Sequence, residues 1–306
     1  MSLSLVEGAK LSNDVLLQGV IETIIKDSPV LQQMPFIQIV GNGLTYNQEA
    51  TLPGAAFYDV GGTWAESTPT FTQKTAILRI LGGDADVDNY LRATRSNVQD
   101  IETAVIELKA KAVRHAFEQA FIYGIESSTP AQFDGLVELI DTDATSAQVI
   151  AAGATGATLT LTMVDTLIDA VKGGKPDLLL MSRRSRRKLN NLARVAGNNL
   201  EVGQGALGEF VQYYNGIPVG VSDWVLDTHV LTASLETAYT GGLCSTIYAV
   251  QFGEGGLCGL TSPEGLQVER IGSLESKDAT RNRIKWYVSL ALFSKVKAAA
   301  LIGVKD

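Results

Sequence analysis

Two runs near the amino terminus alternate between apolar and polar residues, and this pattern predicts a long β-hairpin. The runs are residues 36–52 (FIQIVGNGLTYNQEATL) and residues 68–81 (TPTFTQKTAILRIL). Between them lie Pro53-Gly54 and Gly61-Gly62, which are strong turn signals. The hairpin carries too few large apolar residues to form a core by itself, so we expect it to pack on another surface.

The strongest helical pattern follows the hairpin, from residue 90 to residue 123. Its apolar residues recur three or four positions apart, at Val98, Ile101, Val105, Leu108, Ala112, Ala116 and Ala120. Asp88 or Asn89 can cap the start of this helix, and Gly124 can end it. A helix of this span would be roughly 50 Å long at 1.5 Å per residue, so we expect it to lie across a sheet.

Beyond Gly153, short apolar runs alternate with helical segments, which is typical of a mixed β/α domain. We expect helices at 162–172 and 182–196, and a buried strand at 177–181. Further short strands are expected in NGIPVGVSDW and STIYAVQFG, and an exposed loop at 197–215. Long strands are expected again at 265–276 and 281–304. Residues 1–35 are mildly amphipathic but broken at DSPV, which is typical of an arm that packs on another part.

Composition limits the classes of function. The 306 residues are 45% hydrophobic and 19% charged, an ordinary globular balance. The net charge of −8 argues against binding nucleic acid through its phosphates. The sequence has neither a signal-peptide pattern nor an apolar run long enough to span a bilayer, so we expect a cytosolic protein without a membrane partner. Cys244 and Cys258 lack the spacing of a metal or redox motif.

Few residues are suited to catalysis. The only histidines are His115 and His229, which disfavours metal hydrolases and Ser-His-Asp enzymes. A D-x-D-x-D run begins at Asp84, but Asn89 and Arg95 occupy the places of the Gly and Glu that a calcium loop needs. Capping of the following helix explains these acids better. We therefore expect no catalytic, cofactor-binding or metal-binding residue.

A basic cluster in SRRSRRKL stands out in this acidic chain. Arg183, Arg186 and Arg187 fall on similar faces of the expected helix. Three interpretations remain open: contact with a polyanion, salt bridges to a neighbouring subunit, or a solvated helix face.

The order of these elements resembles that of the tailed-bacteriophage major capsid (coat) protein family, which has the HK97-type fold. The stretches that carry the resemblance are YNQEATLPGAAFYDVGGTWAESTPTFTQKT, AFEQAFIYGIESSTPAQFDGL, GKPDLLLMSRRSRRKL, YYNGIPVGVSDW, IYAVQFGEGGLCGL and RIKWYVSLALF. Together they span about residues 30–304. The resemblance implies an α+β subunit.

The domains that the resemblance implies are an N-arm (1–35), an extended loop or E-loop (36–82), a P-domain (83–150 and 262–296, with a spine helix at about 90–123) and an A-domain (151–261 and 297–306). The implied function is self-assembly into hexamers and pentamers of an icosahedral shell that encloses phage double-stranded DNA without sequence-specific binding. Assembly would take place in the cytoplasm of the bacterial host. A portal protein and, where the shell uses them, separate scaffolding or decoration proteins would be further partners.

Large aromatic residues on a hairpin without its own core are expected to anchor contacts between subunits. The predicted interface residues are Phe57, Tyr58, Trp64, Glu66, Phe71, Lys74, Arg183, Arg186 and Arg187. Two alternatives remain. An encapsulin-type bacterial compartment shell shares the fold, and a carboxylate-dependent enzyme could use the hairpin to form oligomers.

Overall fold

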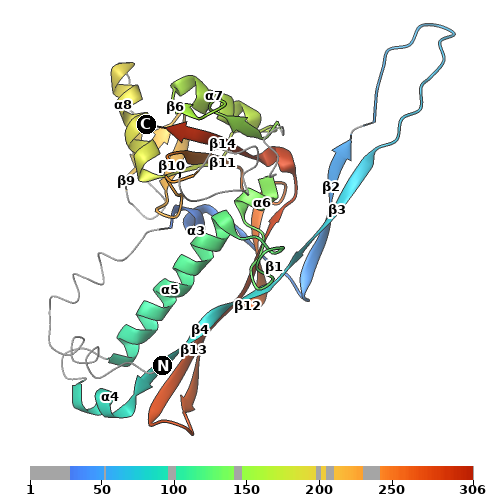
Figure 1. Ribbon diagram of the computed structural model, residues 1–306. Coiled ribbons are helices and arrows are strands. Elements are labelled where there is room, and N and C mark those ends of the chain that lie inside the picture. The colour runs from blue at the N-terminus through green and yellow to red at the C-terminus, as the bar shows by residue number, and fades with distance from the viewer. Residues whose placement is uncertain are drawn as a thin grey trace.

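The computed structural model describes residues 28–51, 53–95, 101–140, 147–197, 201–204, 210–229 and 242–305. These residues form three parts, which can be followed in Figure 1: one built on a wide sheet, one built on a long sheet, and a ribbon that projects away from both. The three parts meet near the carboxyl-terminal end of the longest described helix.

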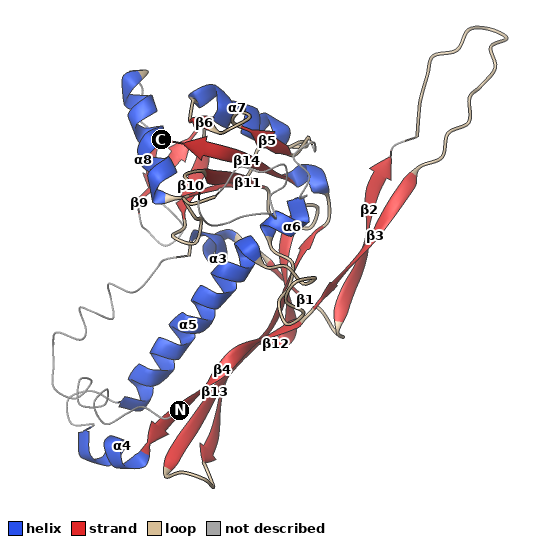
Figure 2. Cartoon of the chain, in the orientation of Figure 1, coloured by secondary structure: helices blue, strands red, loops and turns tan. Residues whose placement is uncertain are grey.

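The long sheet runs through the lower half of the molecule in Figure 2. Its order is β1 (Phe36–Gln38), β12 (Leu257–Ser273), β13 (Ala279–Leu292) and β4 (Arg79–Asp88). β1 is parallel to β12, and the other pairs are antiparallel. Helix α5 (Ile101–Tyr123) packs on this sheet, and α4 (Asn89–Arg95) precedes it. The carboxylate of Asp88 accepts hydrogen bonds from the backbone N–H groups of Tyr90 and Leu91, so Asp88 caps the start of α4. The helix predicted at 90–123 is described as α4 and α5, and its predicted apolar position Val98 lies outside the described residues.

The buried face of α5 differs from the predicted stripe. Ile101 is buried as expected, but Ala112 and Ala116 are exposed. Phe117 and Phe121 are buried in their place, and the ring of Phe117 packs 4.9 Å from that of Trp286 on β13. Burial of an aromatic side chain removes far more apolar area from water than burial of alanine, so the two phenylalanines determine which face turns inward.

The wide sheet forms the upper half of the molecule. Its order is β5 (Val149–Ala151), β14 (Ala298–Lys305), β11 (Ser245–Val250), β7 (Leu178–Met181), β10 (Ile217–Val221), β9 (Phe210–Tyr214) and β8 (Glu201–Gln204), and β6 (Ala157–Thr158) also pairs with β14. Helices α7 (Leu161–Ala170) and α8 (Arg183–Val195) cover one face. The other face packs on α3 (Pro29–Gln33), α6 (Leu136–Ile140) and the end of α5. Because both faces are covered, every residue of β7 and β11 is buried.

The helices predicted at 162–172 and 182–196 are confirmed as α7 and α8. Thr160 Oγ1 accepts a hydrogen bond from Met163 N at the start of α7, and Ser182 Oγ accepts one from Ser185 N at the start of α8. Each cap satisfies a backbone donor that the first helical turn leaves without a partner. Among the helices that the structure describes, none is both long and apolar enough to cross a membrane.

Two strand predictions were wrong in extent. The strand expected at 281–304 is divided, because β13 ends at Leu292 and β14 starts in the other sheet after a short 3-10 helix (Lys295–Lys297). The loop expected at 197–215 contains the short strands β8 and β9, which extend the wide sheet at its edge. Its polar, Gly-rich sequence is typical of a loop, and its strands are identified only by their pairing with each other and with β10.

The acids of the D-x-D-x-D run have different roles. Asp84 and Asp86 face Arg283 and Arg281 across the β4–β13 pair, with nitrogen–oxygen distances of 2.6–3.0 Å. Hydrogen bonds from these guanidinium groups lower the pKa of both carboxyl groups. Helix capping, predicted for the run, holds for Asp88 alone, because only Asp88 directly precedes α4, whereas Asp84 and Asp86 lie inside β4.

Candidate assembly interface

The ribbon consists of β2 (Gly43–Thr51), β3 (Thr70–Ile77) and the loop between them, of which residues 53–69 are described. The two strands pair antiparallel, from Gly43 opposite Ile77 to Thr51 opposite Thr70. We call residues 43–48 and 72–77, which pair next to the body, the ribbon base, and residues 53–69 the ribbon tip. Figure 1 shows the tip far from every other described part of the chain.

The ribbon base is docked on its own subunit. Gln48 is only 4% exposed, and its Nε2 donates a 2.5 Å hydrogen bond to the carbonyl of Leu292. The ring of Tyr46 packs edge-on against Phe293 at 5.0 Å, and burial raises the pKa of its hydroxyl. These contacts fix the direction in which the ribbon leaves the body.

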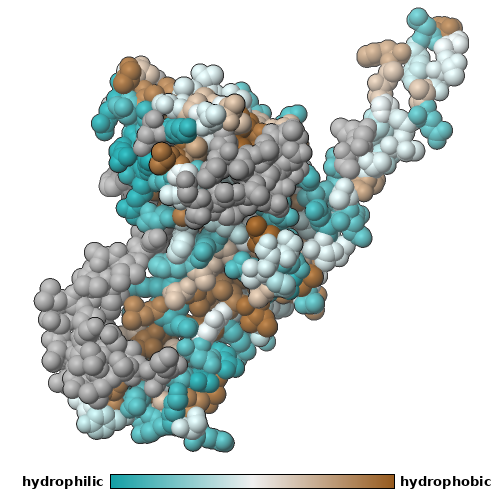
Figure 3. Space-filling view, in the orientation of Figure 1, coloured by the Kyte–Doolittle hydropathy of each residue, from teal (hydrophilic) through white to brown (hydrophobic). Residues whose placement is uncertain are grey.

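The ribbon tip, in contrast, exposes large apolar side chains. Phe57 and Val60 are fully exposed, and Trp64 is 78% exposed. Figure 3 shows apolar residues at the outer end of the ribbon, next to strongly polar ones. Soluble proteins rarely leave such side chains together in water unless they form a binding surface.

The tip has internal order despite this exposure. Tyr58 and Trp64 stack with their ring centroids 4.5 Å apart, and Ala65 N donates to the Tyr58 hydroxyl at 3.0 Å. Gly61 adopts a φ of 88°, a backbone conformation that other residues rarely adopt. The tip is therefore a structured knob rather than an unconstrained loop.

The charged side chains in most of the ribbon are all acidic. Residues 43–73 contain three acidic residues, Glu49, Asp59 and Glu66, and no lysine or arginine. A surface that binds the tip should therefore combine an apolar site with positive charge at its rim.

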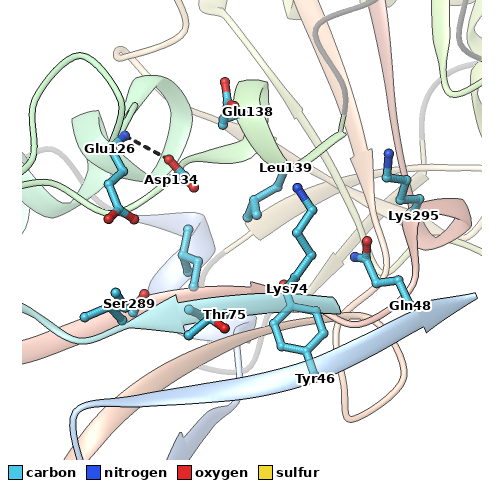
Figure 4. Close-up of a pocket in the computed structure, with 13 residues that line it drawn as sticks. Tyr46, Gln48, Lys74, Thr75, Glu126, Asp134, Glu138, Leu139, Ser289 and Lys295 are labelled. Carbon is cyan, nitrogen blue, oxygen red and sulfur yellow. Dashed lines mark hydrogen bonds between the residues drawn. The ribbon is translucent and has the colours of Figure 1, made fainter. Parts of the chain in front are cut away.

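Lys74 is the first cation of the ribbon. Its side chain lines a cavity of about 170 Å³ between the ribbon base, α6 and Lys295. Figure 4 shows the residues that surround it. Glu126, Asp134 and Glu138 also line this cavity, yet Lys74 forms no ion pair with any residue that the structure describes. Its predicted part in a subunit interface remains a prediction.

The predicted arginines lie on α8, on the far side of the wide sheet from the ribbon. Arg183 forms a two-point ion pair with Asp223 of its own chain, with nitrogen–oxygen distances of 2.5 and 3.0 Å. Arg186 and Arg187 are exposed. Within the described part of the chain, Arg186 has no carboxylate partner.

The structure thus separates the predicted interface residues into three groups. Phe57, Tyr58, Trp64 and Glu66 share the ribbon tip, Phe71 and Lys74 lie along β3, and the three arginines lie on α8. Sequence reasoning missed Asp59 and Val60 at the tip and Gln48 at the base. Val60 could have been found, because a valine directly before the Gly61-Gly62 turn cannot reach a core.

The two histidines take part in packing and hydrogen bonding. His229 is buried, with Nε2 2.8 Å from the Tyr123 hydroxyl and Nδ1 3.0 Å from Thr246 Oγ1. Burial lowers its pKa to about 4, so the imidazole is neutral at physiological pH. His115 lies 5.8 Å from the ring of Trp224. Among the described residues, no three His, Cys, Asp or Glu side chains gather in a way that could hold a metal ion.

Comparisons with known proteins agree with this architecture. A family model described as "SU10 major capsid protein" matches residues 28–240. A search of curated protein sequences found no match. Solved structures with a similar fold include the SrpI encapsulin of Synechococcus elongatus, with 16% identity, a TM-score of 0.68, and coverage of 100% of this chain and 97% of that one.

Two further structures come from phage-related particles. The capsid of a native GTA particle has 18% identity and a TM-score of 0.65, with 92% of each chain covered. A structure from Mycobacterium phage Bobi has 17% identity and a TM-score of 0.63, with 100% of this chain and 99% of that one covered. These likenesses establish the α+β HK97-type fold. The family match covers more than half of the residues, and the chain belongs to the SU10 major capsid protein family, whose members build the shell of a virion from many copies of one structural protein.

Proposed function

We propose that copies of this chain form the hexamers and pentamers of an icosahedral shell, and that the ribbon of each subunit docks on the next. The observation that carries this proposal is the ribbon tip, where Phe57, Val60 and Trp64 are exposed beyond the reach of any described surface of their own chain. Burial of this apolar area between subunits would supply the driving force, at about 25 cal/mol per Å².

The geometry of the ribbon favours a ring. A projection on one side of a subunit that binds a different surface of the next subunit makes a head-to-tail contact, and such contacts close into rings when the rotation allows. Rings of five and of six can then share one kind of contact.

The shell would enclose phage double-stranded DNA without reading its sequence. A net charge of −8 keeps the wall from adhering to the phosphates, because like charges repel. Assembly in the cytoplasm of a bacterial host, with a portal protein and separate scaffolding or decoration proteins, belongs to the same proposal.

The domain boundaries also belong to the proposal. The described strands of the wide sheet lie mainly in the proposed A-domain (151–261 and 297–306), and β4 and β13 lie mainly in the proposed P-domain (83–150 and 262–296). β12 crosses the boundary at 261, so the two domains would share a continuous strand. β1 pairs with β12, although residues 36–82 are the proposed E-loop and residues 1–35 the proposed N-arm.

Removal of the ribbon tip tests the proposal. A variant in which Asn-Gly replaces residues 53–69 should fold with an unchanged melting temperature but fail to form shells in negative-stain microscopy and sedimentation. A variant with an Asn-Gly replacement at Glu254-Gly255, an exposed turn between β11 and β12, serves as the matched control and should still assemble. Normal shells from the tip-less variant would contradict the proposal.

A second candidate function is an encapsulin-type compartment, favoured by the likeness to the SrpI encapsulin over the whole of this chain. The contents of shells purified from the native source distinguish the two functions. Nuclease-protected DNA supports the virion shell, whereas a single protein cargo without DNA supports the compartment.

A further inference from the structure

We propose that the ribbon tip of one copy seats in a groove between α3 and β10 of a second copy, where Arg186 pairs with Asp59 or Glu66. This inference rests on the proposed ribbon-mediated assembly and names the surface that receives the ribbon. It also gives the basic cluster on α8 one of the roles that the sequence left open.

The groove is lined by apolar side chains, by the polar side chains of Gln32, Gln33 and Gln212, and by a single charged residue. Its volume is about 310 Å³, and its apolar walls include Pro29, Leu178, Val211, Pro218 and Val219. Arg186 is the one charged residue among the described residues that line it. Since Arg186 has no carboxylate partner within the described part of its own chain, its charge is available to an incoming acid.

β10, which contributes residues to the groove, is only partly paired with its neighbour β9. β9 pairs with β10 at Ile217 and Pro218 only, whereas β7 pairs with residues 219–221 from the opposite side. Within the described residues, no strand covers the remaining edge of β10 next to the groove. Main-chain groups at such an edge can accept an extended segment from another chain.

The chemistry of the tip matches that of the groove. Phe57 and Val60 project fully from the tip and are the side chains suited to the apolar walls. Asp59 lies between them in sequence, and Glu66 lies on the return of the loop. An acidic knob with apolar anchors therefore meets a groove that offers apolar walls, hydrogen-bonding glutamines and one arginine.

The two surfaces lie on opposite sides of the molecule. In Figure 1 the ribbon leaves toward the upper right, whereas β9, β10 and α8 lie at the upper left. The docked ribbon base prevents the tip from reaching the groove of its own chain. The tip can therefore reach only a second copy, in the head-to-tail arrangement that closes rings.

The internal contacts of the tip divide its residues into anchors and supports. The Tyr58–Trp64 stack and the hydrogen bond from Ala65 N to the Tyr58 hydroxyl hold the loop, while Phe57 and Val60 contribute nothing to that frame. A loop that is ordered before it binds loses less conformational entropy on docking. Trp64, predicted from the sequence as an anchor, therefore also helps to hold the shape of the tip.

Cysteine cross-linking tests the placement directly. A Val60→Cys/Gln33→Cys chain, assembled and then oxidised, should form disulfide-linked multimers on a non-reducing gel. The matched control combines Val60→Cys with Val268→Cys, because Val268 is also exposed but lies on β12 of the long sheet, outside the groove lining. The native Cys244 and Cys258 are buried and contribute little background. Multimers from the control pair but not from the groove pair would overturn the placement.

A charge exchange tests the role of Arg186. Arg186→Glu should raise the protein concentration needed for assembly by ~10-fold or more, because it places like charges together at a docking site. Asp59→Lys/Glu66→Lys should do the same alone, and the two changes together should restore assembly. Arg194→Glu, on the same helix but outside the groove, should have less than about a 2-fold effect. Absence of rescue in the combined variant would contradict the ion pair.

The outcomes separate this inference from the proposed function. If the tip-less variant fails to assemble but neither the cross-link nor the rescue is observed, the ribbon docks elsewhere and the groove assignment is wrong. If Gln33→Cys cross-links instead to a cysteine introduced before Ser28, the amino-terminal segment occupies the groove and the inference is overturned. Normal assembly of the tip-less variant would reject both proposals.

Discussion

The wide sheet and the ribbon are both β-structure, but they bury their side chains in opposite ways. Every residue of β7 and β11 is buried, whereas the first six residues of β3 are exposed. Helices cover both faces of the wide sheet, whereas in the described part of the chain only the base of the ribbon touches the body. The wide sheet therefore gains its stability within one subunit, while the tip can gain burial only from another subunit.

The largest expected effect is a change in the free energy of unfolding, which should be large for a residue of the wide sheet and small for a residue of the ribbon tip. Leu180 is fully buried in β7, so Leu180→Ala should lower the free energy of unfolding of the subunit by about 2–5 kcal/mol. Phe57→Ala should change it by less than about 0.5 kcal/mol, because the side chain is already in water. Urea unfolding of unassembled subunits measures both values. A comparable loss in the Phe57 variant would mean that the tip packs on its own chain.

The pH dependence of stability should come from the body of the subunit. The pKa of His229 falls from 6.5 in the unfolded chain to about 4 in the folded one, so the unfolded state binds more protons between these values. Stability is full above pH 6.5 and falls as the pH drops toward 4, by about 1–3 kcal/mol.

Thermal melting between pH 7.5 and 4.5 checks this expectation. His229→Gln keeps side-chain hydrogen-bonding groups but does not titrate, so its melting temperature should vary less over this range. Asp84 and Asp86, whose pKa values are lowered by Arg283 and Arg281, lose their contribution only at lower pH. An equal slope in both proteins would assign the pH dependence to other groups.

The ribbon base should behave like the body rather than like the tip. Tyr46→Ala removes the edge contact with Phe293 and should lower the free energy of unfolding by about 1–2 kcal/mol. Hydrogen exchange of β2 and β3 amides should become faster in the same variant. Phe71→Ala, near the outer end of the same ribbon, is the matched control and should change stability by less than about 0.5 kcal/mol.

The smallest expected effect is a change in the concentration needed for assembly when the backbone of the tip is strained. Gly61 has a φ of 88°, so Gly61→Ala should strain the turn by about 1 kcal/mol without lowering the stability of the body. The weakened tip should raise the concentration needed for assembly by about 2- to 5-fold. Gly255→Ala is the control, because an added Cβ there meets no atom within 4 Å and φ is ordinary. Unchanged assembly of the Gly61 variant would mean that order in the tip does not matter.

Local patterns predicted much of the fold. The alternation at 36–52 and 68–81 predicted the ribbon, although residues 36–38 form β1 and residues 79–81 begin β4 in the long sheet. The alternation of apolar and helical segments beyond Gly153 predicted α7 and α8. Such patterns succeed because hydrogen bonding and side-chain direction repeat within each element. The division between β13 and β14 could not be predicted, since both strands are apolar and differ only in their partners. The small alanines of α5 likewise gave no indication that Phe117 and Phe121 would be the residues turned inward.

The sequence by itself determined that the hairpin has no core of its own, that its tip is apolar and acidic, and that the chain resembles capsid proteins. These properties depend on residue types and on neighbours along the chain. Only the tertiary structure decided that Gln48 and Tyr46 dock the ribbon base, that Tyr58 stacks on Trp64, and that Arg183 is already paired with Asp223. Each of these contacts joins residues brought together by folding, and their energies depend on distance and burial, which sequence spacing does not encode.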